Sequence, residues 1–158
     1  MATPTKNILL DDQLCFALYT ANKRFNHFYA DALAPFKLTY PQYITLLALW
    51  ENSPMTVREL GSHVNLDSGT LTPLLKRMQT QGWVERNRDE DDERQVNISL
   101  SQKAIDAKSS IFDHVNSCMD LLGMDDKTYA ATRETVNFAA DRIKQADPKK
   151  IKYTGTEI

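Results

Sequence analysis

Residues 56–100 change their hydrophobic period in a way that few folds accommodate. Up to Gly82, apolar residues recur at three- and four-residue spacing, which is typical of amphipathic helices. Thr56 and Glu59 form the pattern of a capping box at the start of the first short helix. Beyond Gly82, apolar and polar residues alternate, which is typical of half-buried strands. The stretch therefore predicts two short helices followed by two strands.

The second of these helices has one apolar and one polar side. We expect Asp67 or Ser68 to cap its start and Gly82 to follow its end. Four residues at helical spacing should face a core: Leu71, Leu74, Leu75 and Met78. Two helices joined by a tight turn and followed by a β-hairpin have the order of a winged helix-turn-helix, which is a DNA-reading module.

The polar side of this helix, residues 68–81, should enter the major groove of DNA. Its candidate contacts with bases and phosphates are Ser68, Thr70, Thr72, Pro73, Lys76 and Arg77. On the hairpin, or wing, the candidate contacts are Arg86, Arg88 and Arg94. The charge balance adds little, because residues 55–100 hold six Lys and Arg against eight Asp and Glu, and a charge run is usually a solvated face. The order of the elements is the stronger indication.

The composition is that of a globular protein. The 158 residues are 42% hydrophobic and 25% charged, with a formal net charge of -2. The longest uncharged apolar run, residues 38–50, is too short to span a bilayer, so we expect a soluble, cytoplasmic protein without a membrane partner. His27, His63 and His114 do not have the spacing of a metal site, and the sequence holds no C-x-x-C, H-E-x-x-H or glycine-rich phosphate loop. We expect neither a metal nor a cofactor.

Long helices should flank the winged module in a single domain, 1–158, of mainly α structure. We expect N-terminal helices over 12–52, the winged module over 56–100, C-terminal helices over 101–145 and a mobile tail over 146–158. The first helix, capped by Asp11 or Asp12, is apolar on more than one side. A chain of this size does not need such helices to close a monomer, so they predict a homodimer built on both ends of the chain.

Cys15 lies near the start of the first helix, where free N–H groups and the helix dipole favour a thiolate. Asp11 and Asp12 oppose that effect, and a lone cysteine on an apolar helix face is often a small buried hydrophobe. Tyr19 is one turn away from Cys15. Tyr29 is 14 residues away, or about 21 Å along a continuous helix, so it can reach only the Cys15 of a second chain.

A resemblance to the MarR family of bacterial dimeric repressors is carried by the segment LTYPQYITLLALWENSPMTVRELGSHVNLDSGTLTPLLKRMQTQGWVERNRDEDDERQVNISLS. The pair QLCFALYTANKRF and LTYPQY resembles one branch of that family, the organic hydroperoxide resistance regulators (OhrR). The resemblance covers roughly residues 12–145 and implies that Cys15 is a peroxide-reactive thiol. In that branch, tyrosines of the other subunit hydrogen-bond to the thiol; here these are Tyr29 and Tyr40, with Tyr19 as a further supporting residue.

The resemblance also implies roles for a second cysteine and for the tip of the wing. In two-cysteine OhrR proteins, a resolving cysteine in the helix after the wing, here Cys118, forms a disulfide with the oxidised Cys15 of the partner subunit. The alternatives are a packed core thiol, or a one-cysteine protein that is modified by a small thiol. The D-x-R motif of MarR wings is matched by Asp92 and Arg94, so that Asp92 braces Arg94 for the minor groove; the alternative is a solvated charged turn.

Together these features predict a dimeric repressor that binds a pseudo-palindromic operator and releases it when an organic hydroperoxide oxidises Cys15. Two alternatives stay open. One is a MarR-type repressor released by a non-covalent small aromatic ligand. The other is a thiol peroxidase that uses Cys15 and Cys118. The winged module would have no role in such an enzyme, so we expect no enzymatic activity.

Overall fold

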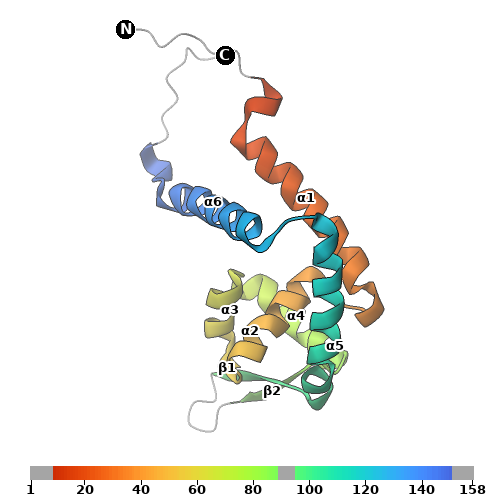
Figure 1. The fold of residues 1–158 in the computed structure, drawn as a ribbon. Coiled ribbons are helices and arrows are strands. Elements are labelled where there is room, and N and C mark those ends of the chain that lie inside the picture. The colour runs from red at the N-terminus through yellow and green to blue at the C-terminus, as the bar shows by residue number, and fades with distance from the viewer. Residues whose placement is uncertain (1–8, 89–94, 151–158) are drawn as a thin grey trace. The chain divides into compact units, whose positions relative to one another are not determined.

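The computed structural model describes residues 9–88 and 95–150. The chain forms two compact units, Met1–Cys118 and Met119–Ile158. The first unit contains α1 (Leu14–Leu33), α2 (Tyr40–Glu51), β1 (Met55–Thr56), α3 (Val57–Val64), α4 (Ser68–Thr80), β2 (Val84–Arg88), β3 (Val96–Leu100) and α5 (Gln102–Met119), whose last residue belongs to the second unit (Figure 1). The second unit contains α6 (Asp126–Gln145). Short 3-10 turns are η1 (Leu10–Asp12), η2 (Ala34–Phe36), η3 (Asp120–Leu122) and η4 (Pro148–Lys150).

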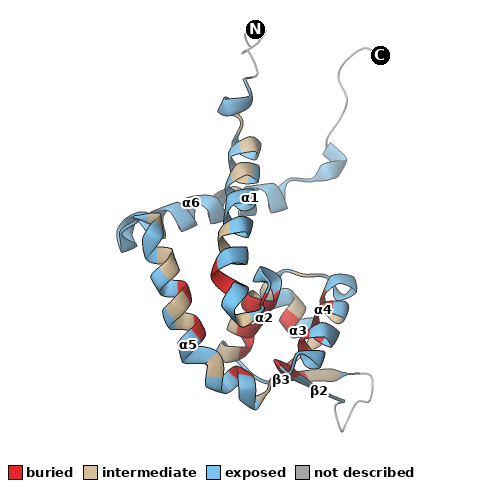
Figure 2. Ribbon diagram, turned by 90° about the vertical axis from the view of Figure 1, so that its right-hand side faces the viewer, coloured by how far each residue is buried: buried red, intermediate tan, exposed pale blue. Residues whose placement is uncertain are grey.

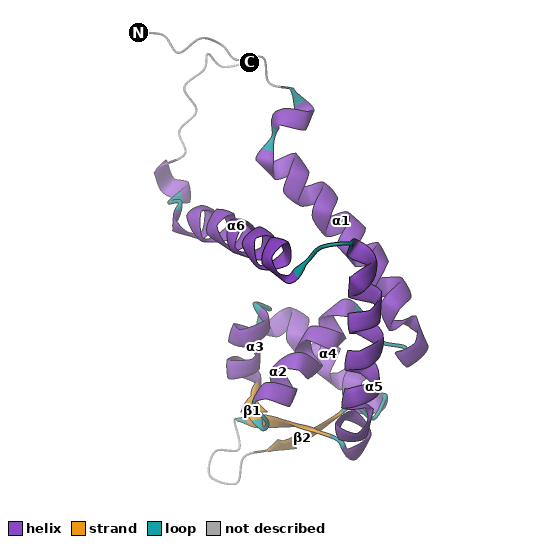
Figure 3. Ribbon diagram, in the orientation of Figure 1, coloured by secondary structure: helices purple, strands orange, loops and turns teal. Residues whose placement is uncertain are grey.

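The fold is mainly α-helical with one small antiparallel sheet, which confirms the predicted winged helix-turn-helix class (Figure 3). β2 and β3 form the predicted hairpin, with Val84 opposite Leu100 and Arg86 opposite Ile98. β1 adds a third strand on the other edge of β3, where Met55 lies opposite Ile98. The sequence did not predict β1, because two residues are too few to show an alternating pattern.

Capping side chains set the starts of α3 and α4. The Thr56 hydroxyl accepts the Glu59 N–H at 3.2 Å, and the Glu59 carboxylate accepts the Thr56 N–H at 2.8 Å, as the capping-box pattern predicted. At the start of α4, the Asp67 carboxylate accepts the Thr70 N–H at 2.9 Å. Gly82 follows α4 with φ +76°, a backbone conformation that L side chains disfavour. Local sequence signals therefore define both helices of the helix-turn-helix.

The start of α1 differs from the prediction. Asp11 and Asp12 lie in the 3-10 turn η1, and Gln13 is the residue that precedes the helix. The Gln13 side-chain amide donates to the Leu9 carbonyl at 3.1 Å and so closes this turn. Neither aspartate caps α1, because both belong to a turn that ends before the helix begins. Cys15 is consequently the second residue of α1.

The core of the first unit lies where α2, α3 and α4 meet the sheet (Figure 2). The four α4 residues that were predicted to face inward are all buried: Leu71, Leu74, Leu75 and Met78. Gln42 of α2 is a buried polar residue, and both ends of its amide are hydrogen-bonded. Its oxygen accepts the Thr39 N–H at 2.9 Å, and its NH2 group donates to the Gln81 side chain at 2.9 Å. The second bond joins the first turn of α2 to the residue that follows α4.

The terminal helices are much less covered than this core. In α1 only Ala32 and Leu33 are buried, whereas Leu14 and Tyr19 are 61% and 62% exposed. Within the second unit, α6 buries no residue and leaves Phe138 67% exposed (Figure 2). Each of these helices therefore carries apolar surface that the described residues of its own unit do not cover.

Three further predictions concern the C-terminal tail, the single domain and the lack of a membrane-spanning segment. The predicted mobile tail over 146–158 contains the 3-10 turn η4, and residues 151–158 lie outside the described residues. The single domain over 1–158 stays a prediction. In the part of the chain that the structure describes, no helix combines the length and apolar character needed to cross a membrane.

Candidate functional site

α4 presents a polar face on the side opposite the core. Its predicted DNA contacts Ser68, Thr70, Pro73, Lys76 and Arg77 are exposed, and Thr72 is half-buried. The backbone N–H of Thr70 holds the pKa of the Asp67 carboxyl below its ordinary value, so the helix starts with an ionised cap at neutral pH. This face can therefore offer two cations and several hydroxyl groups to a polyanion.

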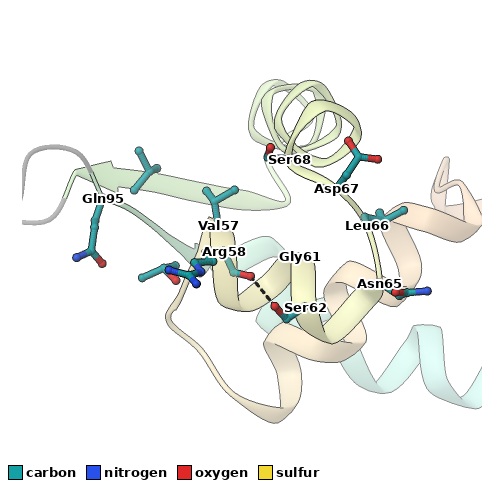
Figure 4. A pocket seen from close by; sticks show the side chains of 11 residues that line it. Val57, Arg58, Gly61, Ser62, Asn65, Leu66, Asp67, Ser68 and Gln95 are labelled. Carbon is teal, nitrogen blue, oxygen red and sulfur yellow. Dashed lines mark hydrogen bonds between the residues drawn. The ribbon is translucent and has the colours of Figure 1, made fainter. Parts of the chain in front are cut away.

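A groove of about 940 Å³ borders the start of α4 (Figure 4). It lies between α3, the turn from α3 to α4, and β3, and its polar lining includes Arg58, Ser62, Asn65, Ser68 and Gln95. Asn65 follows α3 with φ +54°, which redirects the chain into the turn. No pattern in the sequence points to Arg58, Asn65 and Gln95, because these residues meet only when α3 and β3 fold beside each other.

The two described arginines of the wing lie in different environments. Arg88, at the end of β2, is exposed. Arg86 lies opposite the fully buried Ile98, and paired residues point to the same side of a sheet. Its Nε atom is buried and has no hydrogen-bond partner among the described residues. Arg88 is thus the better placed of the two for a phosphate. The other predicted wing residues, Asp92 and Arg94, lie outside the described residues.

An aromatic cluster joins the end of α1 to the start of α2. The ring centroids of Tyr29 and Tyr40 lie 4.5 Å apart, and those of Tyr29 and Tyr43 lie 6.0 Å apart. The structure therefore brings together Tyr29 and Tyr40, the two tyrosines that the family resemblance paired. Tyr19 lies elsewhere on α1, with its ring centroid 6.5 Å from that of Phe16.

Cys15 is an exposed free thiol in the first turn of α1, far from this cluster in the same chain. α1 is continuous from Leu14 to Leu33, and its rise places Tyr29 about 21 Å from Cys15 along the axis. A single chain thus holds the cysteine and the tyrosine cluster at opposite ends of one helix. The roles predicted for Cys15 and Tyr29 both require a second chain.

Cys118 is a half-buried free thiol near the end of α5. Its Sγ atom lies 3.7 Å from Nε2 of His114, one helical turn earlier. The His114 ring in turn meets the Phe36 ring in an edge-to-face contact, with centroids 5.5 Å apart. The spacing of four residues between His114 and Cys118 is visible in the sequence, but the spacing by itself does not distinguish His114 from an ordinary histidine. Among the described residues, no group of three His, Cys, Asp or Glu could hold a metal ion.

Known proteins with similar sequences are transcriptional regulators. A family model described as transcriptional regulator SarA/Rot matches residues 27–111. The HTH-type transcriptional regulator TtmR of Methylorubrum extorquens (strain PA1) is 48% identical over 120 residues. The matched residues cover 75% of this chain and 62% of TtmR, so the chain spans less than two thirds of that regulator. The organic hydroperoxide resistance transcriptional regulator of Bacillus subtilis (strain 168) is 46% identical over 109 residues, which cover 65% of this chain and 74% of that protein.

Solved structures of one regulator, AbfR of Staphylococcus epidermidis, have the same fold. Reduced AbfR bound to DNA is 37% identical, with a TM-score of 0.73 over 85% of this chain and 94% of that one. AbfR with a disulfide formed is 36% identical, with a TM-score of 0.63 over 83% of this chain and 92% of that one. The sequence, the three-stranded winged module and these relatives agree: the chain belongs to the SarA/Rot group of MarR-type transcriptional regulators, in the branch of the organic hydroperoxide resistance regulators, and is a DNA-binding protein and not an enzyme.

Proposed function

We propose that this chain is a homodimeric repressor that binds a pseudo-palindromic operator when reduced and releases it when an organic hydroperoxide oxidises Cys15. One observation carries the proposal: the exposed Cys15 and the Tyr29–Tyr40 pair lie at opposite ends of α1. Two chains whose α1 helices cross can bring each cysteine to the tyrosines of the other chain. The sensor would then exist only in the dimer.

Uncovered apolar side chains support the dimer. Large hydrophobic residues on the terminal helices are not covered within their own units: Leu14, Tyr19 and Phe25 on α1, and Val136, Phe138 and Ile143 on α6. Each apolar side chain gains about 1.5–3 kcal/mol when it is fully buried, so a second copy that covers both helices would gain a large free energy. Such a two-fold dimer carries two copies of α4 and therefore matches two half-sites about one helical turn of DNA apart.

The exposed face of α4 and the groove beside it suit DNA. Lys76 and Arg77 can reach phosphates or base edges, while the hydroxyls of Ser68 and Thr70 lie at the start of the helix. The groove that contains Arg58 and Gln95 has the polar lining that a phosphodiester backbone needs. AbfR, which shares the fold at 37% identity, was solved in its reduced form on DNA.

The redox chemistry follows from the position of Cys15. In the dimer, a tyrosine hydroxyl of the partner subunit can donate a hydrogen bond to the Cys15 sulfur and orient it towards the peroxide. The thiolate sulfur attacks the terminal peroxide oxygen; an S–O bond forms, the O–O bond breaks, and the alkoxide leaves and is protonated to the alcohol. The cysteine becomes a sulfenic acid. The Cys118 thiol of the partner subunit then condenses with it to a disulfide and releases water.

The disulfide would move helices at the dimer centre and change the spacing of the two α4 helices. Because two rigid recognition helices must match their half-sites together, a small change of spacing can cost several kcal/mol of specific binding. AbfR was solved both reduced on DNA and with a disulfide formed, so a relative with the same fold adopts both of the states that the proposal requires.

The test is a mobility shift on the promoter DNA next to the gene for this protein. Wild type, Cys15→Ser and Cys118→Ser proteins would each be compared as reduced, as treated with an organic hydroperoxide, and as re-reduced with thiol. We expect the wild type to bind, to release on oxidation and to bind again, and Cys15→Ser to bind throughout. Cys118→Ser should form no crosslinked dimer on a non-reducing gel. Release of wild type and Cys15→Ser alike would exclude the cysteine sensor and favour a non-covalent ligand.

A further inference from the structure

We infer that His114 is the proton acceptor that activates Cys118 as the resolving thiol. This inference rests on the proposed function, because it assigns a role in the second step of the sensor reaction. It gives His114 the task of positioning and deprotonating the attacking sulfur. His114 itself does not touch the peroxide.

The geometry is that of a nucleophile with its base. Nε2 of His114 lies 3.7 Å from Sγ of Cys118, within the range of a hydrogen bond to sulfur. The two residues are four apart on α5, so their side chains meet on one face of a continuous helix. A thiol and an imidazole at this distance form the pair that activates cysteine nucleophiles in general.

The imidazole is held in place from outside its own helix. Phe36, in η2, meets the His114 ring at an interplanar angle of 72°, with 5.5 Å between centroids. Next along α5, Val115 is buried and fixes that side of the helix in the core. The charged groups nearest in sequence to these contacts are Lys37, after Phe36, and Asp113, whose carboxylate pairs with the Ser109 hydroxyl at 3.4 Å. The contact with the thiol is therefore a fixed feature of the first unit.

His114 can accept one proton from the attacking thiol and pass the same proton to the leaving hydroxide. His114 accepts the proton of the Cys118 thiol, and the resulting thiolate attacks the sulfur of the Cys15 sulfenic acid on the partner subunit. The S–S bond forms as the S–O bond breaks, and the hydroxide that leaves takes the proton from the His114 imidazolium and departs as water. The sulfenic acid is the oxidant: the thiolate supplies the electron pair of the S–S bond, and the electron pair of the broken S–O bond leaves with the hydroxide, so no further reagent is needed. A thiol without a base would attack slowly at neutral pH, because the thiolate is the nucleophile.

A purely structural role for His114 is the competing explanation, since residues four apart on a helix often form hydrogen bonds. The two explanations differ in how the reactivity of Cys118 depends on pH. A base raises the thiolate population only where the thiol is otherwise protonated. A structural contact would change reactivity at every pH or at none.

The first test measures alkylation of Cys118 by iodoacetamide in the full-length Cys15→Ser protein, where it is the one remaining cysteine. Rates would be followed by mass spectrometry at pH 7 and pH 10 with and without His114→Gln, and with His27→Gln, on exposed α1, as the control. We expect His114→Gln to slow alkylation about tenfold at pH 7 and to leave it equal at pH 10, because free cysteine thiols in general, with a pKa of about 8.5, need no base there. Equal rates at pH 7, or the same slowing at both pH values, would overturn the inference.

The second test follows the sensor reaction in the protein with both cysteines. After one equivalent of organic hydroperoxide, a dione probe would trap sulfenic acid and a non-reducing gel would show the disulfide. We expect His114→Gln to accumulate sulfenic acid and to form the disulfide about tenfold more slowly than wild type and His27→Gln. An unchanged disulfide rate would also overturn the role of His114. If no sulfenic acid forms in any variant, the proposed function fails, whereas the alkylation result still decides whether His114 activates Cys118.

Discussion

The winged module and the terminal helices differ in how much of their apolar surface is buried within one chain. In the winged module, the inward residues of α3, α4 and β3 are covered by their own chain; Leu60, Leu75 and Ile98 are fully buried. In α6 no residue is buried, and in α1 only the last two are. The winged module therefore closes its core within one chain, whereas α1 and α6 keep apolar surface that a second chain could cover.

The largest effect should come from placing a charge on the uncovered side of α6. Phe138→Asp should cost roughly 2 kcal/mol per copy, and therefore about a thousandfold in the dimer dissociation constant, because each dimer buries the side chain twice. Sedimentation measurements would follow the dimer, with Asn137→Asp as a control that introduces the same carboxylate beside it. A Phe138→Asp protein that remains as dimeric as the control would show that a second chain does not cover this side of α6.

A slightly smaller effect should come from a cavity in the winged module. Leu75→Ala should reduce the free energy of unfolding by about 3 kcal/mol, since Leu75 is fully buried. Urea unfolding followed by tryptophan fluorescence would measure it, because both tryptophans, Trp50 and Trp83, lie in the first unit. Ile105→Ala, at a position that is 51% exposed, should cost less than about 0.5 kcal/mol. Equal losses for the two variants would contradict the assignment of a closed core.

A third change tests the buried link between α2 and α4. Gln42→Leu should cost about 2 kcal/mol, because the Thr39 N–H loses its acceptor and the Gln81 side chain loses its donor in a part-buried site. The same urea experiment applies, with Gln79→Leu on the exposed side of α4 as the control. A cost no larger than that of the control would show that water replaces both hydrogen bonds.

The smallest effect concerns the acid sensitivity of the helix caps in the two regions. Backbone hydrogen bonds from Thr70 and Thr128 hold the pKa values of the Asp67 and Asp125 carboxyls below their ordinary values in the folded state. Each carboxylate therefore adds stability above its unfolded pKa, near 4, and that stability is lost as the pH falls through the lower folded pKa. The asparagine variants keep a cap without this dependence.

Acid titrations would separate the two regions by their probes. Asp67→Asn should flatten the loss of tryptophan fluorescence signal below about pH 4, since this signal reports on the winged module. Asp125→Asn should leave that curve unchanged and should alter only the loss of helix seen by circular dichroism. If both variants changed the fluorescence curve equally, the two regions would unfold together and the comparison would need revision.

Residues that act within one turn of chain were predictable from the sequence by itself. The capping box of Thr56 and Glu59, the end of α4 at Gly82 and the inward face of α4 depend on spacings of three to five residues, and the structure has all of them. The separation of Cys15 from Tyr29 needed only the rise of a helix. Even a local signal failed at Asp11 and Asp12, because a 3-10 turn and a helix start compete for the same residues.

Contacts between residues far apart in the chain were decided by the tertiary structure alone. β1 exists because Met55 meets Ile98, the groove exists because α3 lies beside β3, and the Gln42–Gln81 bond spans 39 residues. The spacing of His114 and Cys118 was visible in the sequence, but the Phe36 ring that holds the imidazole comes from 78 residues earlier in the chain. No local pattern encodes such pairs, since they follow from how the helices pack, and packing depends on every side chain in the core at once.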